Sequence, residues 1–116
     1  MFGLDSPDGY QEVVPGIRIK TLVSGEKALM TKFLLSAGSK LPDHSHPHEQ
    51  IGTLVSGRMR LTIGERSREV KAGDSWCVPL DAPHHADIIE DSVAVEVFSP
   101  LREDYLKYQN KADLAE

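Results

Sequence analysis

Short segments of alternating or continuous apolar residues run through most of this chain, and turn residues separate them. Residues 58–63 alternate strictly between polar and apolar side chains, which is typical of a strand with one face in water. Eight such segments are predicted strands: 17–23, 28–35, 50–56, 58–63, 66–70, 74–78, 84–89 and 93–99. Because no helical pattern lies between them, the chain is expected to form an all-β jelly roll or barrel over about residues 14–100.

The C-terminal segment has a different pattern. Ser99 is suited to cap a helix and Pro100 to occupy its first position, while Leu101, Tyr105 and Tyr108 recur at helical spacing. The pattern predicts a short helix over about residues 100–110, followed by a frayed tail from 110 to 116.

Length and composition restrict the class of protein. The 116 residues suit a single domain, 1–116, and the 13 basic and 18 acidic residues form no basic stripe, so nucleic acid is not expected as a partner. No apolar run approaches membrane-spanning length, and the first residues do not resemble a signal peptide. The single cysteine, Cys77, excludes an internal disulfide, so we expect a reducing, cytoplasmic location without a membrane partner.

Histidines supply the candidate chemistry. His44 and His46 are two residues apart, so on an extended strand both imidazoles point to the same face. Neutral imidazole is a common metal ligand, and His84 from a distant strand would complete a set with open positions. We expect a divalent transition metal, namely Mn, Fe, Ni, Cu or Zn. The alternative is a surface loop that contains several histidines.

The spacing of glycine, histidine and proline through the centre of the chain resembles the two motifs of the cupin family. The residues that carry the resemblance are Gly38, His44, His46, Gln50, Gly57, Gly73, Pro79 and His84. It implies a cupin jelly-roll barrel, the double-stranded β-helix, and a metal set of His44, His46, Gln50 and His84. Three positions depart from the family pattern: a Glu ligand is replaced by Gln50, a Gly by Asp81 and an Asn by Ile88.

Strand parity bears on the fourth ligand. If Gln50 faces the barrel interior, Gly52 and Leu54 share that face, and Gly52 leaves space for a substrate beside the metal. Glu49 has the opposite parity, but it remains an alternative ligand because carboxylate is the stronger donor. His48 follows a proline and lies either near the metal, facing substrate, or in an ordinary loop.

The last predicted strand offers a second group of candidates. Val93, Val95 and Val97 form one face, and Ala94, Glu96 and Phe98 form the other. If Glu96 faces the cavity, an apolar wall can tune it as a general base; otherwise it is simply exposed.

Arg102, just beyond that strand, also has two possible roles. Its guanidinium can bind a substrate carboxylate in a bidentate manner, or it can pair with Glu103 or Asp104.

Residues 44–50 and 99–106 resemble the small cupins of the pectin-degradation KdgF type, and the similarity extends over about residues 16–106. This resemblance implies linearisation of 4,5-unsaturated uronates to 5-keto-4-deoxyuronates. It places the catalytic roles on Glu96, where the family has Asp, and on Phe98 and Arg102.

Two other functions remain open, together with the expected partners. A neutral shell of three histidines and a glutamine also suits an iron-dependent dioxygenase or lyase. A cupin that binds a small molecule without turnover is the third possibility. The expected partners are a small uronate substrate and a second copy of the chain. A homodimer is implied because small cupins pair through a sheet, and because Ile51, Thr53 and Val55 form an apolar face that needs a cover.

Overall fold

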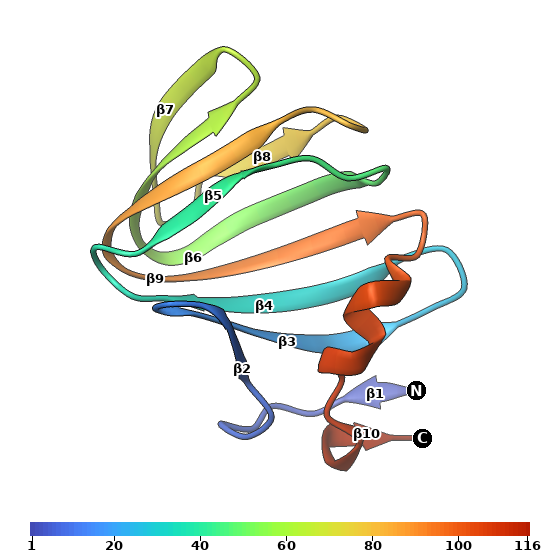
Figure 1. Ribbon diagram of the computed structural model, residues 1–116. Helices are drawn as coiled ribbons and strands as arrows, with labels where there is room; N and C mark the ends of the chain where they lie inside the picture. Colours follow the sequence, from blue (N-terminus) through green and yellow to red (C-terminus); the bar gives the residue numbers. More distant parts are fainter.

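The computed structural model describes residues 1–116 and consists mostly of β-strands (Figure 1). Two short 3₁₀ segments, η1 (Glu103–Tyr108) and η2 (Lys111–Asp113), lie near the C-terminus. No helix has the length and apolar character needed to cross a bilayer. The strands are β1 (Phe2–Gly3), β2 (Gln11–Val14), β3 (Ile17–Ser24), β4 (Leu29–Leu35), β5 (Lys40–His44), β6 (Glu49–Ile63), β7 (Arg66–Lys71), β8 (Ser75–Val78), β9 (His84–Ser99) and β10 (Leu114–Ala115).

Two long strands, β6 and β9, each contribute to both sheets of the barrel. The first half of β6 pairs with β8 and with the second half of β9, which continues into β4, β3 and β2. The second half of β6 pairs with β7 and with the first half of β9, beside β5. The predicted jelly-roll fold is therefore confirmed, although the sequence divided each long strand into two.

A bend shared by both long strands explains that division. Gly57 has a φ of 93°, and a Cβ atom there would overlap the Ser92 hydroxyl. Ser92 Oγ accepts from the Arg58 backbone N–H (3.0 Å) and donates to the Glu90 carbonyl (2.7 Å). The pairing register shifts here, so the turn residues mark a bulge where the strands turn from one sheet to the other.

The hydrophobic core fills the space between the sheets. Side chains that alternate along the strands are buried there, including Ile17, Ile19, Phe33, Leu54, Met59, Val78 and Ile88. Because side chains alternate in direction along a strand, this period-2 pattern leaves the intervening residues on the outer faces.

The C-terminal helix differs from the prediction. It is a 3₁₀ segment that begins at Glu103, with Arg102 at its N-cap position. Ser99 does not cap it, because the Ser99 hydroxyl donates to the Lys27 carbonyl (3.0 Å) and remains part of the sheet.

The predicted frayed tail is also wrong, because both chain ends are ordered against β3. Strand β10 pairs with β1, which places the two termini side by side (Figure 1). Lys20, only 2% exposed, extends its ammonium to the Asp113 carboxylate (3.0 Å) and to the Ser6 and Asp8 carbonyls (2.9 Å each). These bonds hold the N-terminal loop and the C-terminal segment together.

Candidate metal centre

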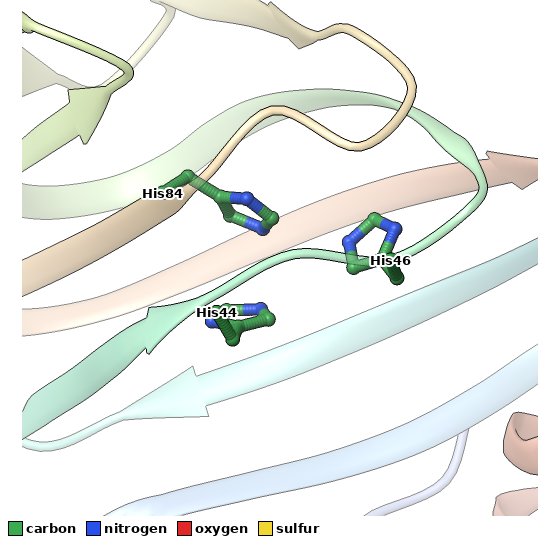
Figure 2. A group of neighbouring side chains, drawn as sticks. All are labelled: His44, His46 and His84. Atoms are coloured by element: carbon green, nitrogen blue, oxygen red, sulfur yellow. The ribbon is translucent and has the colours of Figure 1, made fainter.

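Three histidines from two strands and a loop meet at one end of the barrel. His44 ends β5 and His84 begins β9, and the two residues are partners in the antiparallel register. His46 lies in the loop that leads to β6, and Figure 2 shows its ring turned toward the other two. One ligand nitrogen from each ring lies within 4.8 Å of the others. The cluster is therefore a candidate metal centre.

Backbone carbonyls orient two of these rings. His44 Nδ1 lies 2.8 Å from the Pro42 oxygen, and His84 Nδ1 lies 2.9 Å from the Ala82 oxygen. A carbonyl oxygen only accepts, so each Nδ1 carries a proton, and in the neutral imidazole this tautomer leaves the lone pair on Nε2. Metal-bound histidines show this arrangement, and His84 Nε2 is buried without a hydrogen-bond partner in the protein.

The environment also favours neutral imidazoles. Burial, helped by the nearby Arg102 charge, lowers the pKa of His46 to about 4. Burial likewise lowers the pKa of His84. Only a deprotonated nitrogen can coordinate, so both histidines are in the form that a metal ion requires at neutral pH.

Gln50 lies between the histidines and Glu96. Its Oε1 is 3.0 Å from His46 Nε2, and its Nε2 donates to a Glu96 carboxylate oxygen. Two ligands at right angles, each about 2.1 Å from one ion, lie roughly 3.0 Å apart, so this pair has the spacing of neighbouring ligands. The amide oxygen is thus suitably placed to be the fourth ligand, and that role stays a prediction.

The two alternative candidates beside Gln50 lie elsewhere. Glu49 is exposed, on the outer face of β6, as the parity predicts. His48 is half-buried, with its ring 5.6 Å from that of His46, and it is not part of the three-histidine cluster. Its Nδ1 is buried without a partner.

Glu96 is buried in the cavity wall. Its side chain is 7% exposed, and β9 places it opposite Gly52 of β6. Burial raises the pKa of Glu96 to about 7, although the Trp76 indole, through a hydrogen bond, and the Arg102 charge both favour the carboxylate. Of the two faces that the sequence left open, Glu96 and Phe98 occupy the inner one.

Gly52 does not leave room for a substrate, contrary to the prediction. It pairs with Trp76 of β8, and a Cβ at Gly52 would lie 2.6 Å from indole atoms of Trp76. The glycine therefore accommodates the indole, and Trp76 forms the wall behind Glu96.

Arg102 closes the other side of the cavity. Its Nε donates to both carboxylate oxygens of Asp104 (3.2 and 3.3 Å), so the predicted pairing with a neighbouring acid is present. Its guanidinium carbon also lies 3.7 Å from the ring centroid of Tyr105 and 5.0 Å from that of Phe98. Phe98 in turn packs edge-on against His46 (5.5 Å between centroids).

Tyr105 is a cavity residue that the sequence did not reveal as one. The helical spacing places Tyr105 only on a helix face. Its position at the cavity follows from its packing against Phe98 of β9 (5.2 Å between ring centroids), which is a contact between two elements that the periodicity of one segment does not show.

These side chains enclose a small cavity of about 40 Å³. That volume suits an ion with one or a few waters and is well below the roughly 300 Å³ of a small ligand pocket. A sugar-sized ligand would therefore have to displace side chains at the rim. The polar and aromatic lining residues are Phe33, His44, Gln50, His84, His85, Glu96, Phe98, Arg102 and Tyr105.

Comparison with known proteins agrees with this geometry. Residues 31–99 match the Cupin domain family. The chain is 27% identical to the pectin degradation protein KdgF of Dickeya dadantii (strain 3937) over 105 residues, covering 89% of this chain and 96% of that protein. It is 26% identical over 85 residues to the H2HPP isomerase of Bacillus subtilis. That match covers 71% of this chain but spans only 36% of the isomerase.

Two solved structures have closely similar folds. KdgF from Halomonas sp. superimposes with a TM-score of 0.84 at 28% identity, over 90% of this chain and 98% of that one. An RmlC-like cupin from Shewanella frigidimarina NCIMB 400 gives a TM-score of 0.79 at 25% identity, over 83% and 86% of the two chains.

Proposed function

Since the chain belongs to the cupin domain family, we propose that it is a metal-dependent enzyme that linearises 4,5-unsaturated uronates to 5-keto-4-deoxyuronates. The observation that carries this proposal is a single cavity lined by two members of the three-histidine cluster, by one buried carboxyl group and by one arginine. The similarity to the pectin degradation protein KdgF supports the choice of substrate class.

Each group in the cavity has a separate role in this proposal. His44, His46 and His84, with Gln50, would hold a divalent transition metal, since one ring nitrogen of each histidine converges on the same point and the Gln50 amide oxygen lies beside His46. When bound, that ion supplies Lewis-acid polarisation of a substrate oxygen. Arg102 binds the substrate carboxylate, and Phe98 holds both Arg102 and His46 in place.

Glu96 moves the proton. Ring opening takes a proton from the anomeric hydroxyl and breaks the bond between the anomeric carbon and the ring oxygen, which leaves an aldehyde and an enolate. The enolate becomes a ketone when its carbon receives one proton, so the reaction involves no net oxidation or reduction. One carboxyl that accepts the first proton and donates the second is sufficient, and Glu96 is the buried carboxyl of the cavity.

The direct test is turnover by metal-loaded protein. We expect the absorbance of the unsaturated bond to disappear faster than in the uncatalysed reaction, without oxygen consumption. Uptake of oxygen would instead identify the dioxygenase alternative. Background rates with every unsaturated uronate, together with measurable ligand binding, would identify a binding protein and overturn the proposed reaction.

Replacing Arg102 with alanine tests the carboxylate contact. Hydrogen bonds to charged groups contribute about 1.5–3 kcal/mol, so KM for the uronate should rise roughly 10- to 150-fold with a smaller change in kcat. KM for the methyl ester of the substrate should rise much less, because the ester has no carboxylate for Arg102 to bind. Lys107→Ala, which removes a cation from the same 3₁₀ segment, is the matched control. Equal losses for acid and ester would contradict this role.

A homodimer is the second part of the proposal, and the outer face of one sheet supports it. Ile51 is 52% exposed and Val55 is 55% exposed, and Ile51 lies between Val97 of β9 and Cys77 of β8. Val95 continues the same surface beside Thr53. A contiguous apolar sheet face of this kind is typical of an interface between subunits.

Light scattering at micromolar concentration should therefore give twice the chain mass of 12.8 kDa. Ile51→Arg should shift the protein to the monomer, because it places a charge at the centre of this face. Ile89→Arg introduces the same charge on the exposed face of the other sheet and should leave the dimer intact. A monomeric wild type would rule the dimer out.

A further inference from the structure

We infer that Tyr105 and Asp104 are positioning residues that hold the Arg102 guanidinium in a fixed orientation beside the cavity. The consequence for substrate binding rests on the proposed function. The orientation of the side chain itself does not, because it can be measured without metal or substrate.

Two aromatic rings and one carboxylate contact the Arg102 guanidinium. Tyr105 lies against it at 3.7 Å and Phe98 at 5.0 Å, which are cation–π distances. The Nε edge donates to both oxygens of Asp104. The two terminal nitrogens make no hydrogen bond within the protein, and Arg102 lines the cavity, so these nitrogens remain available to a ligand carboxylate.

Tyr105 connects this arrangement to the barrel. Its carbonyl oxygen accepts from the Thr21 hydroxyl of β3 (2.6 Å), and Thr21 is only 1% exposed. Its backbone N–H donates to the Arg102 carbonyl (3.0 Å), and its ring packs edge-on against Phe98 (5.2 Å). A rigid strand therefore determines where the guanidinium lies, although Arg102 itself belongs to no strand.

Fixing the Arg102 side chain in advance reduces the conformational entropy that it loses when a ligand binds. A free arginine side chain samples many rotamers and loses that freedom when it binds a ligand. An arginine already fixed by a ring and a carboxylate loses less, so the same hydrogen bonds give tighter binding. Asp104 is 57% exposed, so the ion pair by itself contributes little to stability, and its value lies in orientation.

Nuclear magnetic resonance of the Arg102 Nε–Hε group tests the positioning directly. In wild-type protein this signal should be slow to exchange and shifted upfield by the Tyr105 ring. Tyr105→Phe keeps the ring and should keep the signal. Tyr105→Leu should abolish the upfield shift, and Asp104→Asn should make exchange faster. Glu103→Gln neutralises a neighbouring acid of the same segment and serves as the matched control for Asp104→Asn.

Kinetics then tests the effect on substrate. Tyr105→Leu should raise KM for the uronate roughly 2- to 30-fold with little change in kcat, and Tyr105→Phe should behave like wild type. If Tyr105→Leu retains the wild-type Nε–Hε signal, or Tyr105→Phe loses it, the inference is wrong. If the signal changes as expected while no variant turns over a uronate, the positioning role stands and the proposed function fails.

Discussion

Replacing His84 with alanine should remove the metal and, with it, nearly all turnover. His84 is the cluster member that begins β9, and it pairs with His44 of β5 in the antiparallel register. Loss of a supporting residue around a metal commonly lowers affinity 10- to 100-fold, and loss of a ligand should cost more than about 100-fold. Metal analysis of protein purified from metal-replete cells, followed by the uronate assay, measures both effects.

His85→Ala is the matched control for metal content. His85 is the next residue, but its Nδ1 faces Asp43 (3.4 Å) and it is not part of the cluster. The His85 variant should retain the metal. Full metal occupancy in the His84 variant, with unchanged activity, would refute the assignment of the centre.

Replacing Glu96 with glutamine should lower turnover by roughly 10²–10⁴ while metal content stays intact. Glutamine keeps the size and can still accept the hydrogen bond from the Gln50 amide, but it cannot accept a proton. Steady-state kinetics on metal-loaded protein, together with metal analysis, separates the loss of the base from the loss of the ion.

Glu96→Asp serves as the comparison, because it keeps the carboxyl and shortens the side chain by one methylene. It should retain more activity than the glutamine variant. An iron dioxygenase would not depend on this carboxyl in the same way. Wild-type turnover in the glutamine variant would therefore argue for a different reaction or a different base.

Strand periodicity predicted much of this structure from the sequence. The alternation placed Gln50, Gly52 and Leu54 on one face of a strand, and all three are buried on the inner face of β6, because a strand with one buried face allows only one register. For Glu96 the sequence left both faces open, and the burial of Phe98 on the same face now identifies the inner one.

Features that depend on contacts between distant segments were not predictable in this way. A lysine in a strand normally indicates an exposed position, yet Lys20 is buried. Its ammonium can be buried because it donates to the Asp113 carboxylate and to two backbone carbonyls. The turn signal at Gly57 predicted the end of a strand. In the structure its positive φ and its close approach to Ser92 form a bulge, and the strand continues. The position of Trp76 beside Gly52 was also not predictable, because the two residues lie on different strands and only the pairing of β6 with β8 brings them together.

The C-terminal segment gives the cavity two separately encoded halves. The histidines and Glu96 lie within residues 31–99, the region that matches the family, whereas Arg102 and Tyr105 lie just beyond it. Under the proposed function, substitutions at Arg102 and Tyr105 would therefore change which anion is recognised without altering the strands that carry the histidines. In evolutionary terms, this short C-terminal extension would be the segment in which a new substrate preference could arise while the barrel stays the same.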